Sequence, residues 1–180
     1  EGETIVKEAD LNMVLTQICT HVSRAAEIVG RLKTFSRKAD FSREVIQIND
    51  CIRAVNKIIG RQISLQNIDL ILDLAQWVPP VLAHNNRVEQ VIFNLVTNAR
   101  DAINERIEEK KDIDRGVITV STFFDERTVG LAIADNGNGI DPKHRDLIFE
   151  SFYTTKEMGE GLGLGLSIIQ GIIKDYNGTI

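Results

Sequence analysis

Apolar residues form a sustained heptad pattern at the start of the chain. Between residues 8 and 36 they recur at alternating spacings of four and three, at Leu11, Leu15, Ile18, Val22, Ala25, Val29 and Leu32. This pattern predicts one helix of a coiled coil or helical bundle. A lone helix cannot bury such a seam, so we expect a partner helix from another chain or from a segment outside this sequence. The stretch SRKADFSRE (36–44) lacks the pattern and is expected to be a linker.

Beyond this linker, short alternating stretches are interspersed with helical periodicity. Strands are expected over residues 44–50, 68–74, 116–126 and 127–135, the last two as an antiparallel pair. Helices are expected over residues 51–60, 85–110, 142–149 and 164–176. Asn49 and Asp50 are expected to cap the first of these helices and Gly60 to end it, while prolines keep 77–83 extended. This alternation predicts a two-layer α/β sandwich with helices on one face of a mixed sheet.

The composition of the chain limits the classes of partner that it is expected to bind. Its 180 residues are 43% hydrophobic and 26% charged, with a net charge of −5, as in ordinary globular proteins. No basic stripe stands out, so nucleic acid is not an expected partner. Cys19 and Cys51 lie in apolar helical patterns without a nearby Cys or His partner, which indicates reduced core thiols in a cytoplasmic protein. No apolar run reaches the ~18 residues of a membrane span.

The helix expected over 85–110 carries an apolar face and a narrow polar stripe. The apolar face comprises Val88, Ile92, Leu95, Val96, Ala99 and Ile103. The polar stripe comprises Arg87, Gln90, Asn94, Asn98 and Asp101. Asparagine is a poor helix former, so two asparagines one turn apart belong either to a solvated surface or to a site. As a site, the stripe would direct two amide oxygens and one acid at a metal–phosphate ligand, for which Mg²⁺ is suited.

Two glycine-rich segments are the other candidates for chemistry. In ADNGNGI (134–140), Asp135 ends an apolar strand, and Gly137 and Gly139 leave room for a ligand; a simple Asn-Gly turn is the alternative. A carboxylate there suits an exocyclic amine such as that of adenine. GEGLGLGLSI (159–168) opens a helix but lacks the Walker lysine and the dinucleotide spacing. It is either a phosphate-binding loop of another kind or a flexible connector.

Four segments taken together resemble sensor histidine kinases. NLVTNARDA (94–102), DNGNGI (135–140), IFESFYTTK (148–156) and GLGLGLSI (161–168) are similar, in order and spacing, to the N, G1, F and G2 boxes of that family. The family shares a superfamily with gyrase, MutL and a heat-shock chaperone, and the TTK form resembles its nitrogen- and dicarboxylate-sensing branch. The resemblance covers residues 45–180 and implies the Bergerat ATP-binding fold. One position departs, because the family commonly has Thr where Leu162 stands.

The resemblance also implies a role for each matching residue. Asn98 would be the main Mg²⁺ ligand, with Asn94 beside the metal and the phosphates of ATP. Asp135 would bind the adenine amine, and Lys156 and Arg100 would neutralise phosphate charge, with Asn94 and Lys156 as catalytic residues. The full set of implied ATP-binding residues is Asn94, Asn98, Arg100, Asp101, Asp135, Gly137, Gly139, Ile140, Thr154, Thr155, Lys156, Gly161, Leu162, Gly163, Leu164 and Gly165.

The loop before the closing helix would be a mobile lid over the phosphates. Its glycines, between 159 and 165, would be the hinges, and the helix that follows would favour anions at its N-terminus. Phe149, Phe152 and Tyr153 are expected to anchor the near side of this lid.

For the whole protein, the resemblance implies a kinase of which this chain holds the catalytic part. Residues 1–42 would be the second helix of a dimerisation and phosphoacceptor hairpin plus linker. Residues 43–180 would be the ATP-binding catalytic domain, whose C-terminal strands fall outside the chain. His21, His84 and His144 lack the acid and proline that follow the family's acceptor. The acceptor histidine is therefore expected on a hairpin helix outside this sequence, and His84 and His144 are expected to be capping or surface residues.

The expected activity is transfer of the ATP γ-phosphate to that histidine in a cytoplasmic homodimer, with the receiver domain of a response regulator as the further partner. Two alternatives stay open: a nucleotide-dependent interaction module without catalysis, and an ATPase that hydrolyses ATP. In the ATPase relatives a Glu that activates water usually stands at the position of Asn94. An amide is a poor base, which argues against hydrolysis.

Overall fold

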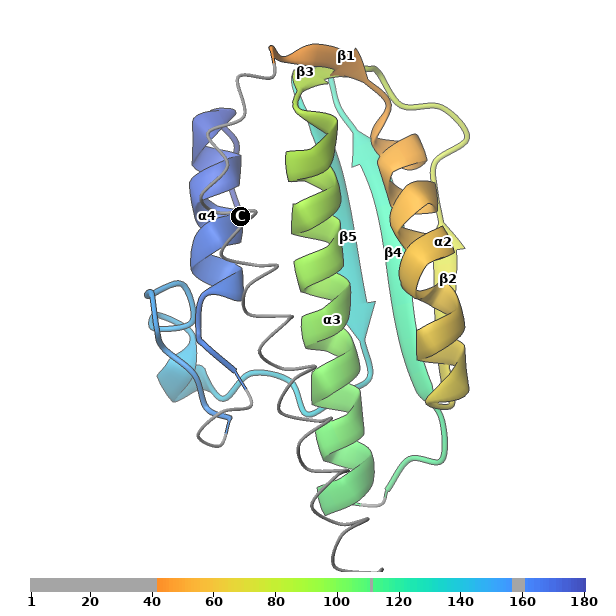
Figure 1. Cartoon of the computed structure of the whole chain (residues 1–180), viewed down its shortest axis with the longest axis vertical. Coiled ribbons are helices and arrows are strands. Elements are labelled where there is room, and N and C mark those ends of the chain that lie inside the picture. Colours follow the sequence, from red (N-terminus) through yellow and green to blue (C-terminus); the bar gives the residue numbers. More distant parts are fainter. Residues whose placement is uncertain (1–41, 111, 157–160) are drawn as a thin grey trace, which may run out of the picture. The chain divides into compact units, whose positions relative to one another are not determined.

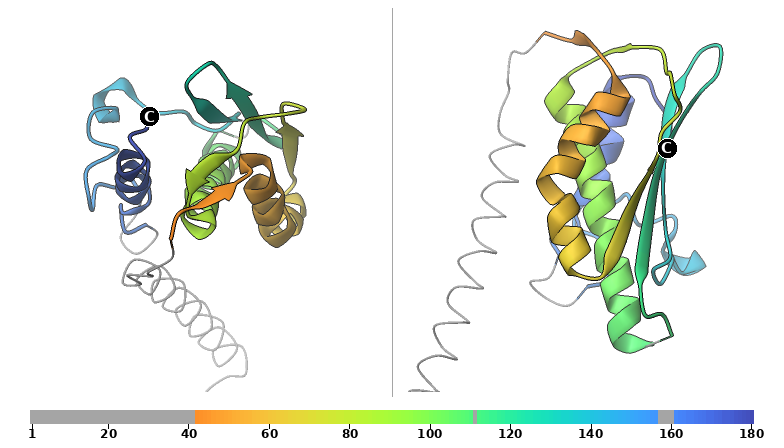
Figure 2. Two further views of the ribbon diagram at one scale, coloured as in Figure 1. Left: turned by 90° about the horizontal axis from the view of Figure 1, so that it is seen from above. Right: turned by 90° about the vertical axis from the view of Figure 1, so that its right-hand side faces the viewer.

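The computed structural model describes residues 42–110, 112–156 and 161–180, which form helices layered on one face of a mixed sheet (Figure 1). The two layers are seen edge-on in Figure 2, where the helices stand on one side and the sheet on the other. The expected two-layer α/β fold is therefore confirmed. The heptad helix expected over 8–36, with Cys19 and His21, lies outside the described residues.

Three strands form the larger sheet in the order β2-β4-β5. β2 (Ile68–Asp73) runs parallel to β4 (Gly116–Phe124), and β4 runs antiparallel to β5 (Val129–Asp135). The predicted antiparallel pair is thus confirmed. Its turn is closed by Asp125, whose Oδ1 accepts the backbone N–H groups of Arg127 and Thr128 at 2.8 and 2.7 Å. A second, two-stranded sheet pairs β1 (Glu44–Ile46) with β3 (Val81–Ala83).

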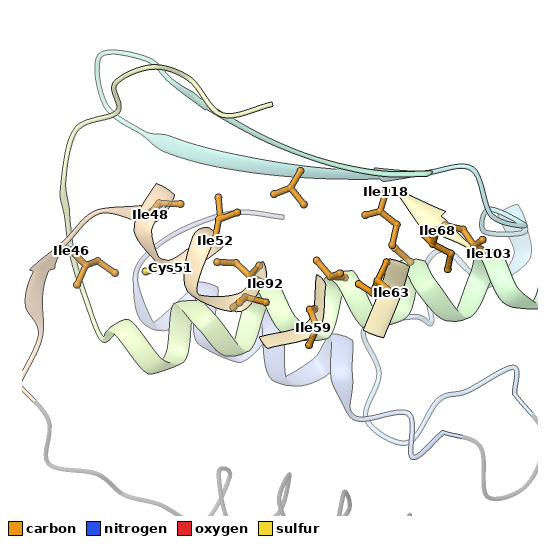
Figure 3. Close-up of a cluster of buried hydrophobic side chains, with 14 of the residues drawn as sticks. Ile46, Ile48, Cys51, Ile52, Ile59, Ile63, Ile68, Ile92, Ile103 and Ile118 are labelled. Carbon is orange, nitrogen blue, oxygen red and sulfur yellow. The ribbon is translucent and has the colours of Figure 1, made fainter. Parts of the chain in front are cut away.

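The core lies between the sheet and two helices, α2 (Ile48–Leu65) and α3 (Asn85–Glu109), and isoleucine dominates it (Figure 3). Its least exposed side chains include Ile52, Ile63, Ile68, Ile92, Ile103 and Ile118. The predicted apolar face of α3 is confirmed at Ile92, Val96, Ala99 and Ile103, all of which are buried. Fully burying one such side chain contributes about 1.5–3 kcal/mol, so this layer holds the scaffold on which the polar stripe is mounted.

Cys51 belongs to this core, as predicted. Its thiol is free and buried, and Sγ lies 3.1 Å from Asn85 Oδ1. Burial, reinforced by the charge of Glu89, raises the pKa of the thiol to about 11. The thiol is therefore neutral at physiological pH and unreactive as a nucleophile.

The predicted ends of α2 are wrong at both sides. The helix starts at Ile48, because the amide of Asn49 is used elsewhere: it donates to Ala75 O and accepts from the Thr122 hydroxyl, both at 3.0 Å. Nor does Gly60 end the helix, which continues to Leu65. Apolar positions beyond Gly60 keep the helix on the core, as buried Ile63 shows. The chain turns away at Asn67, whose φ is 60°.

A second apolar cluster joins α3 to the last helix, α4 (Gly165–Asp175), which lies beside it in Figure 1. Val91 on α3 packs there with Ile169 and Ile172. Residues 142–149 do not form the predicted helix: only Pro142–His144 adopt a 3-10 turn. Backbone hydrogen bonds from Leu147 and Ile148 to His144 O continue this segment as turns.

Candidate functional site

The polar stripe of α3 faces the beginning of α4. Asn98 is half-buried there, and a methyl group added to Gly165 would lie 3.9 Å from both terminal atoms of its amide. Asn94 lies one turn earlier on α3 and is also half-buried. The glycine-rich segment therefore ends beside Asn98, one helical turn from Asn94.

Asp101, one turn after Asn98, holds two cations. Its Oδ1 accepts from Arg100 Nε and Nη2 at 2.9 and 2.5 Å, and its Oδ2 pairs with Lys156 Nζ. All three side chains are half-buried, so this network is shielded more than a surface ion pair is. Two cations on one carboxylate leave an excess positive charge, which attracts anions. The sequence analysis assigned Lys156 and Arg100 to one site but did not predict that Asp101 would pair with both.

The segment 135–140 packs against the next residue of the same helix, Ala102. A Cβ on Gly137 would lie 2.7 Å from the Ala102 carbonyl carbon and 2.8 Å from its Cβ. The Asn138 N–H donates to Ala102 O at 3.2 Å. Gly137 is therefore needed for contact with α3, whereas the sequence analysis assigned its smallness to ligand approach. Gly139 differs, since its φ is +71° and no atom of the described residues lies within 4 Å of an added Cβ.

Asp135 ends β5 as predicted and is exposed. Its Oδ1 accepts the N–H of Gly137 at 2.8 Å, which fixes one side of the carboxylate and leaves Oδ2 for another donor. Ile140 is about half exposed. Thr155, Gly139 and Ile140 form no hydrogen bond to the other site residues within the described ranges.

The loop that carries Lys156 is tied to the glycine segment through its backbone. Phe152 N donates to Gly163 O at 2.9 Å, and Gly163 has a φ of +63°. Thr154 Oγ1 accepts the Lys156 N–H at 3.2 Å, and Gly161 lies against both side chains. The Phe152 side chain does not anchor the loop, because it is 75% exposed. The backbone of Phe152 has a φ of 69°.

Tyr153, in contrast, does anchor this loop. Its hydroxyl bonds to His144 Nδ1, which also gives that histidine a structural partner. Phe149 is half-buried. His84 likewise pairs with a tyrosine, since its Nδ1 lies 2.7 Å from the Tyr176 hydroxyl. It occupies the N-cap position of α3 without a side-chain cap bond.

The N-terminus of α4 has no side-chain cap among the described residues. Leu164 is its N-cap. The first N–H groups of a helix have no partner within it and favour negative charge. Leu162, where the family resemblance expects Thr, is about one-third exposed.

The donor set fits a magnesium ion that takes most of its ligands from phosphate and water. Among the described residues, no three His, Cys, Asp or Glu side chains are grouped to hold a metal. The amide oxygens of Asn94 and Asn98 are hard donors, and Mg²⁺ commonly uses one or two protein ligands together with phosphates.

No helix in the described ranges is long and apolar enough to cross a membrane.

Sequence reasoning missed Arg106 and Asn136. Arg106 Nη1 donates to Asn136 O at 2.8 Å and to Gly137 O at 3.3 Å. Asn136 ties the end of β5 to β4, because its Oδ1 accepts Val117 N–H at 2.7 Å. The signal for Arg106 was its position one turn after Ala102, on the face of the helix that meets this segment.

Comparison with known proteins agrees with this geometry. Residues 83–180 match the family model for histidine kinase-, DNA gyrase B- and HSP90-like ATPases. The chain is 34% identical to the sensor kinase CckA of Brucella abortus over 92% of its length, and 30% identical to the C4-dicarboxylate transport sensor protein DctB of Pseudomonas aeruginosa, again over 92%. It spans only 18% and 26% of those two relatives.

A solved complex of the histidine kinase ThkA with the response regulator protein TrrA is also similar. The TM-score is 0.73 at 26% identity, over 98% of this chain and 48% of that one. The predicted resemblance to sensor histidine kinases is therefore confirmed.

Proposed function

The chain belongs to the histidine kinase-, DNA gyrase B- and HSP90-like ATPases, and on that premise we propose that it is the ATP-binding catalytic region of a two-component sensor histidine kinase. Within the protein, residues 43–180 form the catalytic domain, and 1–42 form the second helix of a dimerisation hairpin and its linker. The reaction is transfer of the ATP γ-phosphate to a histidine on a hairpin helix outside this chain.

One observation carries the proposal: the motif on α3 is contacted by the other three motifs, all within residues 98–102. Gly165 abuts Asn98, Lys156 pairs with Asp101, and Gly137 and Asn138 pack on Ala102. Polar and glycine-rich loops without a common function would not be expected to contact five consecutive residues of one helix. A ligand that spans this turn would meet a carboxylate at one end and cations with a helix N-terminus at the other.

The residues divide into a base end and a phosphate end. Asp135 Oδ2 accepts the adenine amine, while Lys156, Arg100 and the first turn of α4 bind the phosphates. Asn98 would hold Mg²⁺, with Asn94 beside it, and the metal would supply positive charge that offsets the charge of the phosphates. A phosphate competes with Asp101 for Lys156, so nucleotide binding replaces one partner of this lysine by another.

The identity of residue 94 favours a kinase over a hydrolase. The amide of Asn94 cannot take a proton from an attacking water, because its nitrogen is a donor and its carbonyl oxygen is not basic. The γ-phosphate is then retained until a protein nucleophile arrives. The further partners are a second copy of the protein, joined through the N-terminal helix, and the receiver domain of a response regulator, at a cytoplasmic location. The ThkA complex with TrrA supports the regulator as partner.

Mixing the chain with Mg²⁺, ATP labelled on the γ-phosphate and a separately made hairpin carrying the acceptor histidine tests this function. We expect acid-labile, base-stable phosphate on the hairpin, and none on a hairpin whose histidine is replaced by glutamine. Release of inorganic phosphate with an unlabelled hairpin would support the hydrolase alternative. ATP binding with neither product would support a non-catalytic interaction module.

Replacing Asp135 by asparagine should weaken ATP binding by about tenfold and reduce the preference for ATP over GTP. The carboxylate only accepts hydrogen bonds, whereas an amide can turn and present its N–H₂ group to guanine O6. Calorimetric titration with both nucleotides measures this. Asp73→Asn is the matched control, because Asp73 is an exposed carboxylate at the end of another strand, β2. An unchanged ATP-to-GTP ratio in Asp135→Asn would contradict the assignment.

A further inference from the structure

One peptide unit beside Asp135 is held from both sides. The unit consists of the Asn136 carbonyl and the Gly137 N–H, which share one rigid plane. Its carbonyl accepts from Arg106 Nη1 at 2.8 Å, and its N–H donates to Asp135 Oδ1 at 2.8 Å. Because the plane is rigid, the contact that orients the carbonyl also orients the N–H and, through it, the carboxylate.

Arg106 is itself fixed by Asp112. Arg106 Nε lies 2.9 Å from Asp112 Oδ1, and Nη2 lies 2.8 Å from Oδ2, which is the two-pronged geometry typical of a guanidinium on a carboxylate. This contact lowers the pKa of Asp112 and raises that of Arg106. With Nε and Nη2 engaged, Nη1 is left directed at the carbonyls of Asn136 and Gly137. A lysine at this position cannot make both sets of contacts.

The opposite side of the segment 135–140 is closely packed. The Gly137 Cα packs directly on Ala102, and the Asn138 N–H is bonded to Ala102 O. The Asn136 side chain joins the strand end to Val117 and to Arg115 O. The loop is therefore seated on α3 and β4, and Arg106 supplies the contact that sets the rotation of the peptide preceding Gly137.

We propose that Arg106 is a positioning residue for nucleotide-base recognition: it holds the 136–137 peptide so that the Asp135 carboxylate presents its second oxygen to the base. The inference rests on the proposed function, since it takes Asp135 as the acceptor of the adenine amine. Arg106 does not touch the nucleotide. It acts on the base end only, so its loss weakens ATP and ADP binding by the same factor, unlike loss of a phosphate ligand.

The test compares Arg106→Gln and Arg106→Lys with Arg115→Gln. Arg115 is a fair control because it lies in the same neighbourhood and also forms an ion pair, with Asp69 at 2.5 Å, but its side chain does not touch the 136–137 peptide. Calorimetry with ATP, ADP and GTP gives affinity and base preference. Amide exchange of Gly137, measured by NMR without nucleotide, reports on the peptide itself, and thermal melting checks the fold.

For Arg106→Gln we expect ATP and ADP affinities each reduced about fivefold or more, a smaller ATP-to-GTP ratio and faster Gly137 exchange. Arg106→Lys should fall between this variant and wild type, and Arg115→Gln should match wild type. A wild-type ATP-to-GTP ratio in Arg106→Gln would overturn the proposal, as would a loss confined to ATP. If the wild-type chain bound no nucleotide, the proposed function would fail instead. Unchanged Gly137 amide exchange in the Arg106 variants would still overturn the proposal that Arg106 holds the 136–137 peptide.

Discussion

Replacing Asn98 by alanine is expected to weaken Mg²⁺-dependent ATP binding by more than tenfold, or about 1.4 kcal/mol. The amide of Asn98 is half-buried on α3 and faces the start of α4, where the phosphates of a bound nucleotide would meet the helix N-terminus. Alanine removes the hard oxygen donor but keeps the helix, because it is the best helix former. The metal would then lose the residue proposed as its main protein ligand, and only Asn94 would stay in place.

Titrations with ATP in the presence and absence of Mg²⁺ separate the metal's contribution from the rest. The loss of affinity should be large with Mg²⁺ and small without it, because the missing amide is proposed to bind the metal and not the nucleotide directly. Asn104→Ala is the matched control: Asn104 lies on the same helix, but its amide donates to Gln66 at 3.2 Å, away from the site. Wild-type Mg²⁺-dependent affinity in Asn98→Ala would rule out this ligand role.

The fold was predictable from the sequence where a periodic pattern extends over many residues. The prediction failed where a side chain has a partner far away along the chain. The apolar face of α3 and the alternating burial of β4 follow from repeats that extend over many residues. The start of α2 was misplaced because Asn49, an ordinary capping residue by sequence, bonds to Ala75 and Thr122, 26 and 73 residues further along the chain. No local pattern contains that information.

The same limit applies to the site. The spacing of Asn94, Asn98 and Asp101 identified one face of one helix, and the motif resemblance identified which loops belong near it. Neither indicated that Lys156 would pair with Asp101 across 55 residues, or that Arg106 would hold the Asn136 carbonyl. Such pairings depend on where the loops sit on α3. They follow from packing contacts such as that between Gly137 and Ala102.

The two glycines flanking Leu164 illustrate the difference between conformational and contact requirements. Gly163 has a φ of +63°, and a Cβ there would lie 2.5 Å from the backbone of both Phe152 and Tyr153. Gly165 has no such angle, and its Cβ would make only an ordinary contact with Asn98. Backbone strain is therefore expected from a substitution at Gly163, while a larger residue at 165 would act through Asn98.

Gly163→Val is accordingly expected to weaken nucleotide binding by tenfold or more and to abolish most phosphotransfer, with the core intact. A β-branched residue is strained at positive φ by about 1–3 kcal/mol, and the neighbouring atoms are backbone, which cannot rotate aside. The chain must move, which breaks the Phe152–Gly163 hydrogen bond and withdraws Lys156 from the turn at Asp101. The core cluster between α2, α3 and the sheet contains none of these residues, so the melting temperature should fall by only a few degrees.

Calorimetry, the phosphotransfer assay and thermal melting measure the three effects on one preparation. Gly171→Ala provides the control: Gly171 lies in α4, and no atom of the part of the chain that the structure describes lies within 4 Å of its added Cβ. Alanine is also the better helix former by about 1 kcal/mol. That variant should bind nucleotide as wild type does and melt at the same or a higher temperature. Wild-type affinity in Gly163→Val would show that the segment from 161 to 164 tolerates displacement, and its part in phosphate binding would then have to be assigned to the first turn of α4 alone.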